Sequence, residues 1–251
     1  MEVAPVTTGD AKVQLLGGFR MFSRGRVIAI PERAAKLVGL LAVHGEPVSR
    51  ARIAADFWPE LAAPRANANL RATIWRLSEV ARSFLSAAST NLALADGVEV
   101  DLGRARSVAR ALLERTTSDA EVTDPSSHRY LELLSRPLLP EWNDSWLILE
   151  RERVRQLHTH ALEHLGRAHL QHGDAMSAVD VGLALVGADP LRESAHILLI
   201  RAYLASGNRG DARRSYQRYR DLMRCELGLP PAIGWSELST SDGGILKDEQ
   251  Q

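Results

Sequence analysis

Short strand-like segments and amphipathic helical segments alternate in the N-terminal part of the chain. Residues 12–22 alternate partly between polar and apolar positions, a turn follows at 23–26, and residues 27–30 are typical of a returning strand. Pro31 predicts the first position of a helix, because a proline there loses no hydrogen bond, and this helix ends near Gly45.

Two further helices and a hairpin are expected before residue 102. Ser49 is a suitable N-cap for a short helix, and the apolar period predicts a third helix from about Arg65 to Leu85. Residues 91–100 are typical of two short strands joined by a hairpin turn at Asp96-Gly97, and the tip of a wing is expected nearer Ala87–Thr90. This order of strands, three helices and a hairpin favours a winged helix-turn-helix.

The pattern is helical in the second half of the chain and repeats with a period of 34 residues. The matching pairs are Ala161/Ala195, Leu165/Leu199, Ala168/Ala202, Leu170/Leu204, Gly173/Gly207 and Ala178/Ala212. The paired glycines separate helices, and the small side chains of Ala178 and Ala212 predict close helix–helix contacts. A period of 34 is that of tetratricopeptide repeats.

The predicted fold is mainly α with a small α/β part. We expect a flexible tail at 1–10, a winged-helix DNA-binding domain at 11–102, an all-α tetratricopeptide-like domain at 103–238, and a disordered tail at 239–251. A polar loop at 117–127 and an irregular connector at 137–144 interrupt the helices, and Trp142 and Trp146 are expected to hold that connector on the first helix pair.

The composition, with 45% hydrophobic and 25% charged residues, is that of a globular protein. No apolar run reaches the roughly 18 residues of a membrane span, and no leader is evident, so a cytoplasmic protein without a membrane contact is expected. Cys225 is the single cysteine, which excludes an intrachain disulfide, and no cofactor is predicted. Residues 1–90 contain 12 basic and 7 acidic residues, a weak indication of a nucleic-acid contact.

The third predicted helix presents a basic face. On a wheel of about 100° per residue, Leu70, Ile74 and Leu77 form the buried stripe, and arginines and small alanines lie on the opposite side. Alanines allow close approach to DNA, while arginine and asparagine pair with base edges or phosphates. The candidate DNA contacts are Arg65, Asn69, Arg71, Thr73 and Arg76. By itself, such a helix is also compatible with an ordinary solvated surface.

Three runs of the chain resemble a known family. The recognition helix of OmpR-type winged helices is similar to the run AAPRANANLRATIWRLSEVARSFL. The bacterial transcriptional activator domain is similar to the two runs LLPEWNDSWLILERERVRQLHTHALEHL and ADPLRESAHILLIRAYLASGNRGDARRSYQRYRDLMRCELGL. Together they are similar to the Streptomyces antibiotic regulatory proteins. This resemblance implies a transcriptional activator that binds repeats in promoter DNA, as a possible homodimer, and contacts RNA polymerase. The family's helix often continues with arginines where this chain has Ser78-Glu79.

Two other interpretations remain open. The sequence His160-Ala161-Leu162-Glu163-His164 matches a zinc-protease pattern, but no third ligand is evident and the repeat explains the helix, so we expect no enzyme. The second is a pure protein-interaction scaffold whose winged helix does not bind DNA. Internal ion pairs at Arg65, Arg71 and Arg76 would favour the scaffold.

Overall fold

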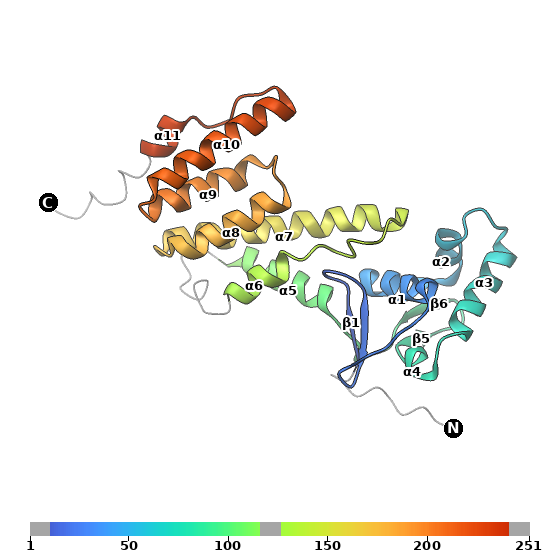
Figure 1. Cartoon of the computed structure of the whole chain (residues 1–251). Helices are drawn as coiled ribbons and strands as arrows, with labels where there is room; N and C mark the ends of the chain where they lie inside the picture. The colour runs from blue at the N-terminus through green and yellow to red at the C-terminus, as the bar shows by residue number, and fades with distance from the viewer. Residues whose placement is uncertain (1–10, 116–126, 241–251) are drawn as a thin grey trace. The chain divides into compact units, whose positions relative to one another are not determined.

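The computed structural model describes residues 11–115 and 127–240, so the predicted tail at 1–10 and nearly all of the predicted loop at 117–127 lie outside the described residues. Contacts divide the chain into two compact units (Figure 1). One contains the residues up to Ser107 together with Arg136–Arg155, and the other contains Val108–Ser135 and the residues from Gln156 onward. The domain boundary between 102 and 103 stays a prediction.

A four-stranded sheet opens the N-terminal unit, with strand order β3-β2-β1-β7. It is formed by β1 (Ala11–Gln14), β2 (Arg20–Ser23), β3 (Arg26–Val27) and β7 (Glu99–Val100). Strand β7 joins β1 in parallel. Directly after it, the Asp101 carboxylate accepts hydrogen bonds from the backbone N–H groups of Leu15 and Leu16, at 2.8 and 3.0 Å, and so holds the chain beyond β1.

A second sheet, with order β4-β6-β5, forms the wing. Its strands are β4 (Val48–Ser49), β5 (Leu85–Ala87) and β6 (Asn91–Leu94). The Ala88 N–H donates to the Asn91 carbonyl at 3.1 Å, which places the hairpin tip in the predicted segment. The predicted hairpin at Asp96-Gly97 is wrong, because β6 pairs with β4 and β5, whereas β7 pairs with β1.

Helices cover the wing sheet and build the core of this unit. They are α1 (Glu32–His44), α2 (Arg50–Phe57), α3 (Ala63–Trp75) and α4 (Glu79–Arg82). Gly45 ends α1 with φ 70°, and the Ser49 hydroxyl accepts from the Arg52 N–H at the start of α2, as the sequence predicts. Leu37, Leu70 and Leu92 are buried in one cluster that joins α1, α3 and the wing.

The third predicted helix is wrong at its C-terminal end, since α3 stops at Trp75. The Ser78 hydroxyl accepts the Ala81 N–H at 3.2 Å and starts the separate short helix α4. Arg82 then donates to the Trp75 and Leu77 carbonyls at 2.9 and 3.0 Å. Because Leu77 and Ala81 are both buried, the apolar period continues through the break and conceals it.

The connector packs against the N-terminal unit. The Trp142 ring stacks on Phe19 at 5.4 Å, and a Cβ on Gly39 of α1 would lie 2.6 Å from it. The expectation that Trp142 and Trp146 hold the connector on the first helix pair is therefore wrong. The Trp142 indole instead occupies the space that Gly39 leaves on α1 of the N-terminal unit. The Arg151 guanidinium donates to the Leu138, Leu139 and Trp142 carbonyls at 2.6–3.0 Å and fixes the connector's shape.

The C-terminal unit is helical throughout its described residues. Its elements include the last part of α5 (Asp101–Glu114), α6 (Ser127–Leu134), the last part of α7 (Ser145–Gln171), α8 (Ala175–Ala188), α9 (Glu193–Ala205), α10 (Arg209–Leu227) and α11 (Trp235–Thr240). Helices α7 to α10 lie side by side in Figure 1. The predicted fold class, a small α/β part followed by tetratricopeptide-like helices, is confirmed.

The 34-residue repeat is visible as two equivalent turns. Gly173 and Gly207 have φ 76° and 75°, a left-handed conformation that favours glycine. The next residues, Asp174 and Asn208, cap α8 and α10 by accepting backbone N–H bonds.

The small residues of the repeat lie at helix contacts, as predicted. Ala178 packs in a cluster with Leu199 of α9, and Ala212 packs with Ile200 of the same helix. Helix α11 was not predicted, and it takes up the first two residues of the expected tail at 239–251, the rest of which lies outside the described residues.

Candidate nucleic-acid interface

Helices α2 and α3 form the helix-turn-helix, and α3 turns one side to the core. Ala66 and Leu70 are buried, Ile74 packs partly buried in the same cluster, and Leu77 is buried just beyond the helix. The predicted anchoring stripe is confirmed. The opposite side of α3 therefore faces solvent and carries the candidate contacts.

Three of the predicted contact residues are arginines with exposed side chains, namely Arg65, Arg71 and Arg76. Within the described part of the chain, none of the three forms an ion pair or a side-chain hydrogen bond. Helix α3 contains no Asp or Glu. The face is therefore positively charged without internal compensation.

The two other predicted residues lie at the edge of this face and are partly buried. The Thr73 hydroxyl donates to the Asn69 carbonyl at 2.9 Å, so its hydrogen is used inside the helix. The Asn69 amide forms no side-chain hydrogen bond among the described residues, so it retains its donors and acceptor. Arg76 lies at the C-cap, where its side chain extends from the end of the helix.

Two side chains at the end of α3, Trp75 and Arg82, were not among the predicted contacts. Trp75 is 78% exposed at the end of α3, whereas Arg82 is engaged with backbone carbonyls and closes that end. Arg50, at the start of α2, was also missed. Its N–H donates to the Thr90 carbonyl, which brings this residue beside the wing tip.

The wing tip is neutral. Residues 86–91 read Ser-Ala-Ala-Ser-Thr-Asn, with hydroxyl and amide groups and no charged side chain. This loop therefore offers only neutral hydrogen-bonding groups. The charge of the interface comes from α3 and its immediate neighbours.

The zinc-protease pattern has a different role in the structure. Glu163 is buried, and its carboxylate accepts hydrogen bonds from Arg192 Nε at 2.6 Å and from the Ser194 hydroxyl, while His160 is exposed. Burial raises the pKa of Glu163, but these hydrogen bonds and the charges of Arg192 and Arg167 lower it below its ordinary value. Glu163 therefore forms a structural ion pair between α7 and α9.

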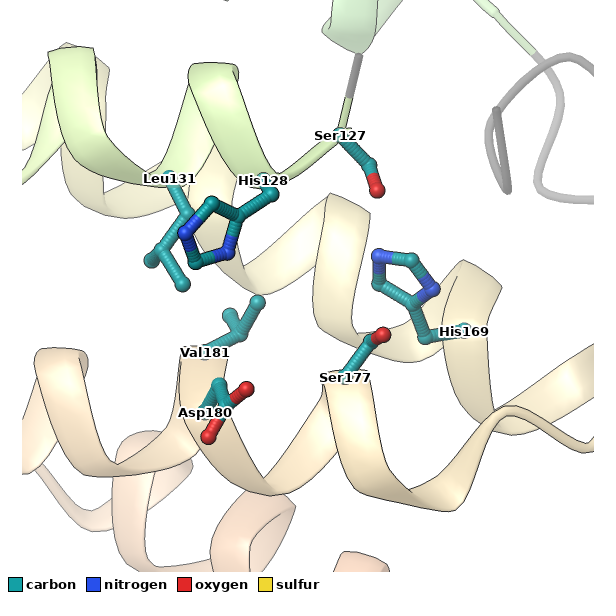
Figure 2. Close-up of a pocket in the computed structure, with 7 residues that line it drawn as sticks. All are labelled: Ser127, His128, Leu131, His169, Ser177, Asp180 and Val181. Atoms are coloured by element: carbon teal, nitrogen blue, oxygen red, sulfur yellow. The ribbon is translucent and has the colours of Figure 1, made fainter. Parts of the chain in front are cut away.

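A small cavity lies between α6, α7 and α8 and is lined by Ser127, His128, Leu131, His169, Ser177, Asp180 and Val181 (Figure 2). Its volume of about 20 Å³ admits roughly one water molecule. Burial lowers the pKa of His169 despite Asp174, whose Oδ2 lies 3.1 Å from His169 Nδ1. The described residues contain no group of three or more side chains suited to a metal ion.

No helix in the described ranges is both long and apolar enough to cross a membrane.

Residues 127–240 match the model of the bacterial transcriptional activator domain family. The chain is 29% identical over 238 residues to the regulatory protein AfsR of Streptomyces coelicolor. The aligned region covers 92% of this chain and 24% of AfsR. The chain thus spans about a quarter of that relative's length.

A solved structure has the same fold. Mycobacterium tuberculosis EmbR, in complex with a low-affinity phosphopeptide, aligns with a TM-score of 0.67 and 21% identity, over 92% of this chain and 64% of EmbR. The resemblance to regulators with a bacterial transcriptional activator domain is confirmed.

Proposed function

We propose that the chain is a sequence-specific DNA-binding transcriptional regulator, from the premise that residues 127–240 match the bacterial transcriptional activator domain family. The observation that carries the proposal is the face of α3. Arg65, Arg71 and Arg76 are exposed, and no ion pair within the described residues neutralises them. Since internal ion pairs at these arginines would have favoured the scaffold alternative, their absence among the described residues supports DNA binding.

The proposed complex places α3 in the major groove. Ala68 and Ala72 let the helix backbone approach the base edges, while the arginines and Asn69 contact guanine, adenine or phosphate. The neutral wing tip at 88–90 lies against the adjacent backbone or minor groove. Because the wing has no cation, the salt dependence of binding comes mainly from arginines on the helices.

The finer parts of the proposal follow from the family resemblance. The regulator activates transcription by contacting RNA polymerase, and two copies bind tandem promoter sites. A balance of 12 basic and 7 acidic residues at 1–90 favours paired binding, because one weakly cationic domain holds DNA weakly.

The test compares two triple variants on promoter DNA. Arg65/Arg71/Arg76→Ala should lower affinity about a hundredfold or more, since each arginine contact contributes about 1–3 kcal/mol. The matched control, Arg201/Arg209/Arg224→Ala, removes the same charge from exposed positions of the C-terminal unit and should bind nearly as wild type does.

Salt titrations separate the roles of the arginines. The slope of log K against log salt should fall by about one for each arginine that holds a phosphate. Equal affinity of wild type and the α3 triple variant, with both folded by circular dichroism, would favour the scaffold.

A further inference from the structure

Trp75 is the most exposed large apolar side chain in the described residues, at 78%. The other tryptophans are covered. Trp58 is 4% exposed, and Trp142, Trp146 and Trp235 are partly buried against other aromatic rings. Exposure of a whole indole is costly in water, and such side chains are concentrated at binding surfaces.

Trp75 lies on the alanine-lined side of α3. It follows Ala72 by three residues and Ala68 by seven, so the three share one face. Side chains on a helix lean toward its N-terminus, which directs the indole over the Ala72 turn. Arg82 holds the Trp75 carbonyl at 2.9 Å, so the position of this last helical residue is fixed.

Charge decides which partner fits this indole. Arg71 precedes it by four residues and Arg76 follows it directly, at the end of a helix without acidic residues. A second copy of the same face would oppose arginine with arginine, whereas the DNA backbone is complementary. Within the major groove, the apolar feature that distinguishes a base is the thymine C5-methyl group.

We propose that Trp75 determines sequence specificity by packing its indole on a thymine methyl group in the major groove. The inference rests on the proposed DNA-binding function and adds a base preference to it. The contact is apolar, so it discriminates thymine without a charge and without a salt-dependent term.

The experiment starts by selecting bound duplexes from a pool of random 30-base-pair DNA with the wild-type chain. Each thymine of the selected duplex is then replaced by uracil, which removes the methyl group and preserves base pairing. At one position, this change should weaken wild-type binding about fourfold, the value of one buried methyl group. Trp75→Ala should bind the thymine duplex at least about tenfold more weakly and should show no uracil effect.

Two variants control for indirect effects. Trp75→Phe keeps an apolar ring and should restore part of the uracil effect. Val80→Ala removes an exposed apolar side chain, 50% exposed, from α4 and should bind as wild type does. Acrylamide quenching of tryptophan fluorescence should decrease when the duplex binds, and Trp75→Phe, which keeps the other four tryptophans, should lose this decrease.

The outcomes are distinguishable. Failure of the wild-type chain to select any duplex overturns the proposed function, and this inference with it. Selection followed by equal affinity of wild type and Trp75→Ala, or by the same uracil effect in both, overturns the inference alone. If, without DNA, Trp75 becomes protected from acrylamide as the protein concentration rises, the indole belongs to a self-association surface. This result also overturns the inference.

Discussion

Helices α8 and α9 approach closely at Gly182, and we expect Gly182→Ala to destabilise the C-terminal unit. A Cβ at this position would lie 2.9 Å from the Leu199 Cα and 3.0 Å from the Leu199 Cβ. Since backbone atoms of α9 cannot rotate away, the two helices must separate. Overpacking of this kind costs about 1–3 kcal/mol.

Gly187 of the same helix supplies the matched control. A Cβ at Gly187 would meet nothing within 4 Å, so Gly187→Ala should stabilise the protein by about 1 kcal/mol through helix propensity. Both substitutions gain the same propensity term. The difference in unfolding free energy between the two variants therefore isolates the packing cost, about 1–3 kcal/mol.

The assay is urea unfolding followed by far-UV circular dichroism, with hydrogen exchange to locate the change. Gly182→Ala should lower the urea midpoint relative to Gly187→Ala and accelerate amide exchange in α8 and α9. Equal midpoints, with unchanged exchange in α9, would refute the close approach of these two helices.

Three further predictions concern the connector, the buried ion pair and the repeat. Arg151→Lys should lower the free energy of unfolding in urea by about 1–3 kcal/mol, because one ammonium cannot replace the guanidinium at three carbonyls. An unchanged urea midpoint would show that these three hydrogen bonds do not stabilise the connector. Glu163→Gln should lower the unfolding free energy at neutral pH. Because the folded pKa of Glu163 lies below its ordinary 4.5, the difference in unfolding free energy between wild type and variant should be complete above pH 4.5 and disappear as the pH falls through the folded pKa. A difference that does not depend on pH would contradict this prediction. Ala178→Leu and Ala212→Leu should each lower the unfolding free energy by about 1–3 kcal/mol, and unchanged melting of both would remove support for the repeat contacts.

Much of the fold could be predicted because it depends on local patterns. The matched turns at Gly173 and Gly207 need a left-handed residue and a cap after it, and both requirements are met by neighbours in the chain. The same holds for the helix that follows Ser49. The buried stripe of α3 could be recognised from a wheel, since its period is a property of the helix itself.

The break after Trp75 shows where local pattern was insufficient. Apolar residues continue in register through Leu77 and Ala81, so hydrophobic period alone extends the helix. The competing Ser78 cap and the Arg82 side chain decide the end of α3, and Arg82 reaches back seven residues to the Trp75 carbonyl. The structure also shows how exposed Trp75 is at this helix end, 78%, and the inferred base contact rests on that exposure.

The sequence by itself determined the first strands, the helices up to Trp75, the repeat, the basic face and its anchoring stripe, because each is encoded by residues close together in the chain or by a regular period. Only the tertiary structure decided the pairing of β7 with β1, the seat of Trp142 at Gly39, and the partner of Glu163. It also decided that Arg65, Arg71 and Arg76 are without ion pairs among the described residues. These features depend on which distant residues the fold brings within contact distance. Periodicity along the chain does not encode such pairings.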